Sequence, residues 1–333
     1  MRIICIIKQI TCSAFYEKVV IKKFSLRSIA SPIMTNTYPS LQPFDLAEDA
    51  GYQAWREARL AAYGALAADT VVPVRDIASL DAREHAAILA HCRASNFAIY
   101  EVTGGKATDK QAIRAFGRQF GLEHLDTNLR ADEDSITSLR VIEAAAGTHY
   151  VPYTNRPLNW HTDGYYNRPD RQVRGIVMHC VSTSASGGEN LLLDHEIAYL
   201  LLRDENPDYI RALMQPDAMT IPPNIEAGIE LRAAQSGPVF SVAPDSGTLH
   251  MRYTARSRSI EWKDDRNTRL AVGFLLELLA SDSIYTVRHR LRAGPGIICN
   301  NVLHKREAFS NDAAAGQQRL LYRARYHDRI RGT

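Results

Sequence analysis

The 333-residue sequence has little cysteine, and the cysteines it has follow no structural pattern. They form no CxxC pair and no regular spacing, and they are Cys5, Cys12, Cys92, Cys180 and Cys299. This excludes a zinc module of paired cysteines and a disulfide framework. A protein without disulfides suits a reducing compartment, so we expect a cytoplasmic location.

Long apolar runs and repeats are also absent. No stretch approaches the roughly 20 apolar residues that span a bilayer, so we expect no membrane partner. No repeat period or low-complexity tract occurs, which excludes a solenoid. With 45% hydrophobic residues, the chain can bury a large core, in one large domain or two small ones.

Excess positive charge is confined to the first 33 residues. This leader holds six Lys or Arg residues against one acid, Glu17, and carries a net charge of +5. The whole chain carries +3, which leaves −2 for the remainder, so we expect no nucleic-acid partner. The leader lacks both a signal-peptide cleavage site and the Arg enrichment of a transit peptide. We expect Met34 to be the natural start.

Helical patterns dominate the first part of the chain. Apolar spacing predicts helices over residues 53–67 and 80–95. The run NFAIYEV, residues 96–102, predicts a strand. Thr108 and Gln111 fit a capping box that opens a helix over residues 112–120.

Strand patterns dominate the second part. Residues 172–181 predict a buried strand, and Asp194 fits the N-cap of a helix over residues 195–205. One further helix is expected over residues 268–280, among short strands at 238–242, 248–253, 285–291, 296–301 and 319–326. The fold class is therefore mainly β with flanking helices (α+β), with a sandwich or jelly-roll core.

A His-x-Asp motif and one remote histidine carry the chemistry. His161 and Asp163, in the segment WHTDG, point to the same side of an extended strand. Both can bind one metal ion, while His304, after Asn300 and Asn301, supplies a third ligand. Three protein ligands leave positions open for a co-substrate and O2, as non-haem Fe(II) requires. Zn(II) is the alternative metal for the same ligands.

Four motifs in order carry a family resemblance: WHTDG (160–164), SGGEN (186–190), PGIICNNVLHKREAF (295–309) and RLLYRARYHD (319–328). On them, the sequence from Tyr153 to Arg323 resembles the TauD/TfdA-like superfamily of Fe(II)/2-oxoglutarate-dependent oxygenases, including its γ-butyrobetaine hydroxylase-like branch. The resemblance implies a double-stranded β-helix that holds Fe(II) by His161, Asp163 and His304. Because iron halogenases of this superfamily lack the carboxylate ligand, Asp163 favours hydroxylation or a related oxidation.

The resemblance also implies a site for 2-oxoglutarate. It places the far carboxylate of this co-substrate on Arg319, whose forked donors suit that group. Arg323 shares the strand face of Arg319 and is a second candidate, for 2-oxoglutarate or for an acidic substrate group. Asn190 stands where many members have Thr. Its amide can donate the same hydrogen bond, or it caps the turn after Gly188.

The substrate residues are less clearly indicated. The candidates flank the metal motif or lie in one later segment, and they are Tyr153, Asn159, Tyr165, Tyr166, Arg252 and Arg256. The tyrosines fit either a cage for a trimethylammonium group or half-buried edges of the core. Arg252 or Arg256 fits a partner for a carboxylate or sulfonate. Members of the betaine-hydroxylase branch often carry an N-terminal zinc module, which the cysteines here do not provide.

The predicted function is an Fe(II)- and 2-oxoglutarate-dependent oxygenase that uses O2 to oxidise a small, charged metabolite and releases succinate and CO2. We expect residues 34–333 to form one catalytic domain, with a helical part over about residues 34–135 and the jelly roll over about 136–330. The alternatives are a metal-dependent hydrolase on the same ligands and a non-catalytic jelly-roll sensor of a small acid. Only the oxygenase forms succinate. A homodimer is the default assembly.

Overall fold

The computed structural model describes residues 43–333 except 66–70, 105–107, 128–131, 133, 143–150, 257 and 259. The chain divides into two units, Met1–Ser40 and Leu41–Thr333. The expectations for the leader, residues 1–33, and for Met34 lie outside the described residues. The fold below is that of the second unit.

A six-stranded sheet forms one side of the core. Its order is β1 (Val71–Val74), β2 (Phe97–Val102), β16 (Pro295–Cys299), β5 (Gly175–Ser182), β19 (Leu320–Tyr326) and β3 (Thr137–Leu139). All neighbours are antiparallel except β1 and β2. Because β1 and β2 belong to this sheet, the part expected to be helical contributes strands to the core.

A second sheet lies opposite and carries the metal motif. Its order is β15 (Val287–His289), β7 (Asn190–Leu193), β17 (Leu303–Arg306) and β4 (Leu158–His161), all antiparallel. Beyond β4, Thr254 forms a β-bridge with His161. A mainly β core with flanking helices agrees with the predicted fold class.

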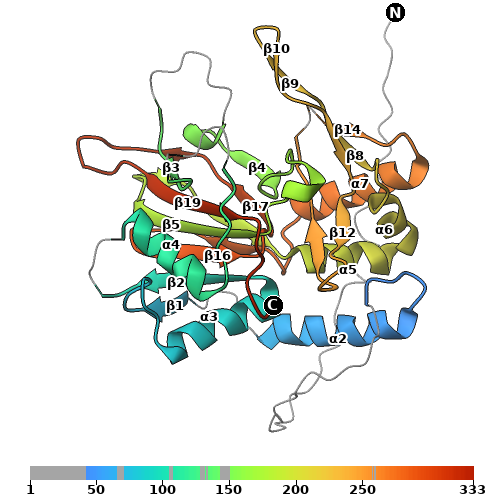
Figure 1. The fold of residues 1–333 in the computed structure, drawn as a ribbon, viewed down its shortest axis with the longest axis horizontal. Helices are drawn as coiled ribbons and strands as arrows, with labels where there is room; N and C mark the ends of the chain where they lie inside the picture. The colour runs from blue at the N-terminus through green and yellow to red at the C-terminus, as the bar shows by residue number, and fades with distance from the viewer. Residues whose placement is uncertain are drawn as a thin grey trace, which may run out of the picture. The chain divides into compact units, whose positions relative to one another are not determined.

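Figure 1 shows the helices and sheets as a ribbon, and three apolar clusters lie between these layers. Residues such as Met178 and Leu192 fill the space between the two sheets. A second cluster packs α3 (Ala82–Ser95) and α4 (Lys110–Gln119) on the outer face of the large sheet. The third packs α5 (His195–Glu205), α6 (Pro207–Leu213) and α7 (Arg266–Ala280) on the outer face of the smaller one. The site lies between the sheets.

Helix starts follow local capping chemistry. Asp81 and Glu84 form a reciprocal capping box at α3, and the Asp194 carboxylate accepts from Glu196 N at α5, as predicted. The predicted Thr108–Gln111 capping box is wrong, because Asp109 is the N-cap of α4 and accepts from Ala112 N. A further helix, α2 (Asp49–Ala65), begins before the range predicted for it.

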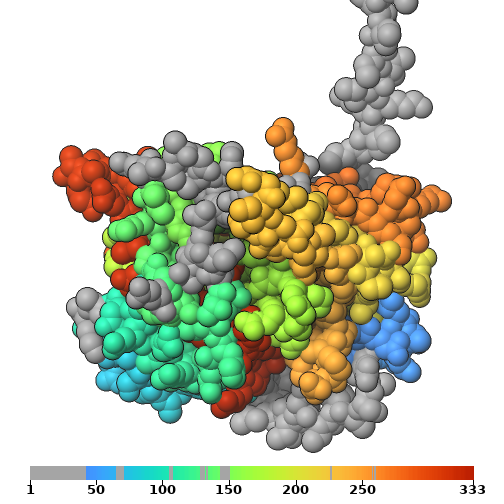
Figure 2. Space-filling model, turned by 45° about the horizontal axis from the view of Figure 1, so that its top comes forward, coloured from blue at the N-terminus to red at the C-terminus, as the bar shows by residue number. Residues whose placement is uncertain are grey.

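Short elements connect these layers. They are η1 (Val151–Tyr153), η2 (Pro169–Arg171), β6 (Ser186–Gly187), β8 (Met219–Ile221), β9 (Asn224–Glu226), β10 (Ile229–Arg232), β11 (Gln235–Gly237), β12 (Phe240–Val242), β13 (Leu249–Met251), β14 (Glu261–Trp262) and β18 (Phe309–Ser310). Figure 2 shows the gold β9–β10 hairpin beside the light-green segment that follows β4. None of the described helices has the length and apolar character needed to cross a membrane.

Candidate metal centre and active site

Three candidate ligands converge between the sheets. His161 ends β4, and His304 lies directly opposite it on β17, with ring centroids 4.3 Å apart. Asp163 follows His161 by two residues. One ligand atom from each of the three side chains lies within 4.8 Å of the others, and all three residues are buried. The structure therefore brings together the three residues expected to hold the metal.

Backbone carbonyls orient both histidines. Nδ1 of His161 lies 2.8 Å from Asn159 O, and Nδ1 of His304 lies 2.9 Å from Val302 O. Because a carbonyl oxygen can only accept, each Nδ1 carries the proton and donates it. Nε2 of each ring then keeps its lone pair, the form in which histidine binds a metal. Burial, helped by the neighbouring His161, lowers the pKa of His304 to about 4, so this ring is neutral near pH 7.

Asn301 fixes the backbone on both sides of the Asp163 side chain. Its Oδ1 accepts from Asp163 N at 2.7 Å, and its Nδ2 donates to Asp163 O at 2.9 Å and to Val173 O at 2.6 Å. Asn301 has φ +50°, a left-handed conformation that asparagine tolerates better than most residues. The position of the carboxylate thus depends on a residue from the loop before β17.

The Asp163 carboxylate is held as an anion. Burial alone would raise its pKa, but the charge of Arg323, the contact with His161 and the charge of Arg325 hold it well below the ordinary value. Arg323 Nη1 donates to Oδ1 at 3.1 Å. Oδ2 is buried and has no hydrogen-bond partner among the described residues, which is rare for a buried oxygen.

This donor set fits a divalent metal ion. Two imidazole nitrogens with free lone pairs and one carboxylate oxygen without a partner suit non-haem Fe(II). The ion would also be the partner that Oδ2 lacks among the described residues. Zn(II) accepts the same ligands, so the geometry alone leaves both metals open.

A second cationic group lies at one end of the same interior. Arg319 and Arg306 are buried next to Phe309, with guanidinium carbons 5.1 and 4.9 Å from its ring centroid. Burial lowers the pKa of Arg319 to about 10 and that of Arg306 to about 9. Arg306 donates to the carbonyl oxygens of Thr154 and Arg156.

Arg319 has no such partner. Among the described residues, its guanidinium makes no hydrogen bond and no ion pair, although it is only 7% exposed. Asn190 faces the same interior, since it lies opposite Arg306 in the β7–β17 register. Its Nδ2 is buried and also lacks a partner among those residues. The interior therefore offers a buried cation and a buried amide donor to an anion.

Two tyrosines and two arginines lie beside the metal motif. Tyr165 and Tyr166 make an edge-to-face pair with centroids 5.2 Å apart. The guanidinium of Arg256 lies 6.0 Å from the Tyr165 ring, and Arg325 donates to Tyr166 Oη at 2.9 Å. Asn159 is exposed, and its Nδ2 lies 3.4 Å from Ala255 O. The role of Tyr165, Tyr166, Arg256 and Asn159 in binding a substrate stays a prediction.

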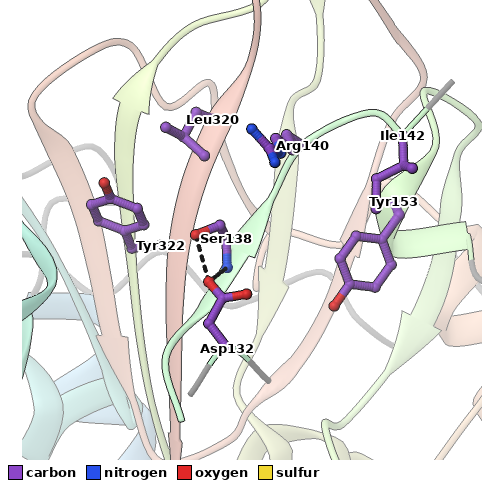
Figure 3. A pocket seen from close by; sticks show the side chains of 7 residues that line it. All are labelled: Asp132, Ser138, Arg140, Ile142, Tyr153, Leu320 and Tyr322. Atoms are coloured by element: carbon purple, nitrogen blue, oxygen red, sulfur yellow. Dashed lines mark hydrogen bonds between the residues drawn. The ribbon is translucent and has the colours of Figure 1, made fainter. Parts of the chain in front are cut away.

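Two of the suggested substrate residues are placed differently. The buried guanidinium of Arg252 donates to four backbone carbonyls, those of Tyr165, Met219, Gln235 and Gly237. These bonds tie the loops together and use four of the five N–H donors of Arg252. Tyr153 lines a separate cavity of about 500 Å³, whose lining residues include none of the three metal candidates (Figure 3). Asp132 and Ser138 are hydrogen bonded to each other there.

Some residues of the site were missed by sequence reasoning. Asn301 was noted only as part of the motif, because its role depends on a left-handed turn that spacing does not reveal. Arg306 lies two residues after His304, and strand alternation places both on the same face. The sequence therefore contained a signal that could have identified Arg306. Thr254 is 93 residues from His161, so their pairing could not be read from local pattern.

A jelly roll with two histidines and one aspartate between its sheets is the arrangement of a metal-dependent oxygenase. The sequence family described as "Taurine catabolism dioxygenase TauD, TfdA family" matches residues 59–325. The chain belongs to this family of Fe(II)- and 2-oxoglutarate-dependent dioxygenases. This confirms the predicted family, fold and cofactors, and it favours an oxygenase over the hydrolase and sensor alternatives.

Two curated relatives are similar in sequence. A uridine-5'-phosphate dioxygenase from Amycolatopsis sp is 30% identical over 184 residues, which are 52% of this chain and 62% of the relative. A protein of the same name from Streptomyces sp is 29% identical over 223 residues, 64% of this chain and 77% of the relative. The alignment thus spans less than two thirds of the first relative's length.

A solved structure is similar in fold. The non-haem iron oxygenase OrfP, in complex with Fe, succinate and (3S)-hydroxy-L-Arg, has a TM-score of 0.57 and 15% identity. The match covers 75% of this chain and 82% of that one. At this identity the likeness concerns the fold, and it agrees with the double-stranded β-helix expected from the sequence.

Proposed function

We propose that the chain is a dioxygenase in which His161, Asp163 and His304 hold Fe(II) and whose substrate is a nucleoside 5'-phosphate of the uridine type. The observation that carries the metal assignment is the convergence of three buried ligand atoms within 4.8 Å. The substrate class is supported by the names of both curated relatives.

Iron and 2-oxoglutarate supply the oxidising chemistry. A substrate C–H, O2 and 2-oxoglutarate are converted to a substrate C–OH, succinate and CO2, so that one oxygen atom enters each organic product. The residues of the chain hold and orient these partners. Asn301 keeps Asp163 in place, and the carbonyls of Asn159 and Val302 keep both Nε2 atoms ready for the metal.

The far carboxylate of 2-oxoglutarate belongs, in this proposal, on Arg319 and Asn190. Both are buried. Asn190 Nδ2 has no hydrogen-bond partner among the described residues, and the Arg319 guanidinium makes none there beyond its contact with the Phe309 ring. A carboxylate there would neutralise Arg319 and accept from the Asn190 amide. Arg323 is less suited to this role, because its guanidinium already pairs with Asp163. It instead keeps Asp163 ionised.

We also propose a cytoplasmic location and a homo-oligomeric assembly, for which a homodimer is the default. The cysteines among the described residues are free and buried: Cys92, Cys180 and Cys299. Free thiols persist in a reducing compartment. The homodimer is the commonest symmetric assembly of soluble enzymes.

The test is a spectroscopic titration of metal-free protein under anaerobic conditions. Fe(II) followed by 2-oxoglutarate is expected to give the weak visible charge-transfer band of the chelate. Asp163→Ala should abolish the band by removing a ligand, and Arg319→Ala should shift its appearance to higher 2-oxoglutarate concentration. Uridine 5'-phosphate and O2 should then yield succinate.

The outcomes separate the parts of the proposal. Bound iron without a band at saturating 2-oxoglutarate would overturn the dioxygenase assignment. If Arg319→Ala binds 2-oxoglutarate with the same affinity as wild type, only the proposed role of Arg319 would be overturned. A normal band without succinate from any nucleotide would overturn the substrate class.

A further inference from the structure

A strand-like segment, residues 253–256, runs beside β4 at the metal site. Two backbone hydrogen bonds and one bridge hold it there, namely Ala255 N to Trp160 O at 2.8 Å, Thr162 N to Tyr253 O at 3.0 Å, and the pair His161–Thr254. The segment therefore extends the smaller sheet past β4 and lies next to the metal motif along its length.

The pairing fixes which side chains face the metal. Residues directly opposite each other on antiparallel strands share one face of the sheet, so Thr254 lies on the face of His161. Arg256 is two residues further along and returns to that face. The same register places Arg256 opposite Asn159, at the exposed rim of the site.

The contacts of Arg256 agree with this placement. Its guanidinium lies 6.0 Å from the centroid of the Tyr165 ring, and Tyr165 follows Asp163 by two residues. Arg256 is exposed, and among the described residues it makes no hydrogen bond and no ion pair. It is thus a cation at the rim whose donors are available to a ligand.

The neighbouring arginines are already engaged. They bind protein groups: Arg252 donates to four backbone carbonyls, Arg323 pairs with Asp163, and Arg325 pairs with Asp126 and Tyr166. Recruiting any of them for a substrate would leave a buried partner without its hydrogen bond, at a cost. Arg256 can bind an anion without breaking a contact.

We infer that Arg256 binds the phosphate group of the substrate and makes the enzyme selective for phosphorylated over unphosphorylated substrates. The inference rests on the proposed function, since it concerns how that same site recognises a nucleotide. A guanidinium presents forked donors that match phosphate oxygens. A phosphate held at the rim leaves the rest of the nucleotide to extend along the sheet face toward the metal.

The experiment compares uridine 5'-phosphate with uridine, alongside other phosphorylated metabolites and their unphosphorylated counterparts. Succinate formation gives kcat/KM for both members of each pair in wild type, Arg256→Ala, Arg256→Lys and Arg83→Ala. Arg83 is an exposed residue of α3, so its variant makes the same change in net charge away from the site. The Fe(II)/2-oxoglutarate charge-transfer band reports in every variant whether the cofactor site is intact.

We expect Arg256→Ala to raise KM for the phosphorylated substrate on the order of 10- to 100-fold, the worth of a charge-assisted hydrogen bond. The preference of this variant for the phosphorylated compound over its unphosphorylated counterpart, measured as a ratio of kcat/KM, should fall by the same factor. Arg256→Lys should recover part of it, and Arg83→Ala should behave as wild type. An unchanged preference in Arg256→Ala, with nucleotide turnover in wild type, would overturn this inference alone. Turnover of no phosphorylated compound, despite a normal band, would overturn the proposed substrate class and this inference with it.

Discussion

At the scale of single residues, Asn301 fixes the backbone that carries the Asp163 side chain, although it is not one of the three candidate metal ligands. It makes three hydrogen bonds, two of them to the backbone of Asp163 itself. Its left-handed φ of +50° is part of the arrangement, because another conformation would turn the amide away from Asp163. The side chain and the backbone of one residue thus act together.

We predict that Asn301→Gly weakens Fe(II) binding by roughly 10- to 100-fold, the usual effect of losing a group that orients a metal ligand. Glycine accepts the positive φ, so this variant removes the hydrogen bonds and keeps the backbone relaxed. Asn301→Ala removes the same bonds and adds strain, and should also lower the free energy of unfolding. Anaerobic metal titration and urea unfolding measure the two effects. Wild-type metal affinity in the Gly variant would show that the bonds do not position Asp163.

At the scale of elements, the large sheet depends on close contact between β16 and its neighbours. A Cβ on Gly296 would overlap the ring of Tyr100 on β2 and lie 2.6 Å from Met178 O on β5. Neither group can move away, since one is a buried ring and the other a backbone carbonyl. The absence of a side chain at residue 296 lets three strands pack.

We predict that Gly296→Ala lowers the free energy of unfolding by about 1–3 kcal/mol, the usual cost of overpacking a core. Gly273→Ala is the matched control. Gly273 lies inside α7, and a Cβ there would meet no atom within 4 Å, so alanine should raise stability by about 1 kcal/mol through helix propensity. Urea unfolding of both variants tests the contrast. A stable Gly296→Ala protein would mean that the sheet can open at this point.

Local chemistry explains which elements could be predicted from the sequence. The helix after Asp194 and the strand around Gly175–Ser182 were predicted because capping and apolar runs act within a few residues. The start of α4 was assigned to Thr108 although Asp109 is the cap, since adjacent Thr and Asp compete for one role. The pairing of residues 253–256 with β4 was not predicted, because register between distant segments depends on tertiary packing.

The residues of the candidate site also differ in how well the sequence alone predicts their roles. The cluster of His161, Asp163 and His304 could be predicted, because a two-residue spacing on a strand and an ordered set of motifs can be read from the sequence alone. Arg252 was taken for a substrate residue because sequence shows its charge and not its four carbonyl partners. Arg256 has the same charge and lacks such partners among the described residues. Only the structure separates these two arginines.

At the scale of the whole molecule, β5 connects both layers of the core. It lies between β16 and β19 in the large sheet. Its side chains alternate between the cluster under α3 and α4, which contains Val177, and the cluster between the sheets, which contains Ile176 and Met178. Loss of β5 would expose both clusters at once, so we expect the second unit to unfold as one cooperative transition.

Protonation of His179 makes the free energy of this unfolding transition depend on pH. It lies on β5, is 2% exposed, and stacks against Tyr100 with its Nδ1 3.3 Å from the hydroxyl. Burial lowers its pKa from 6.5 to about 4. The folded state therefore keeps the ring neutral where the unfolded state binds a proton. Between pH 6.5 and 4 the unfolded state holds more protons, so stability must fall as pH falls through this window.

We predict that this one residue contributes up to ~1.4 kcal/mol of lost stability per pH unit below about pH 6. His179→Gln keeps a polar group beside Tyr100 and cannot titrate, so its stability should depend less steeply on pH. The difference in stability between wild type and variant should therefore change little from pH 7.5 to 6.5 and then shift in favour of the variant down to pH 4.5, as measured by urea unfolding of metal-free protein. Because all other titrating groups are shared, the difference isolates His179. Parallel pH profiles would show that His179 has the same pKa in the folded and unfolded states, and would contradict the lowered pKa.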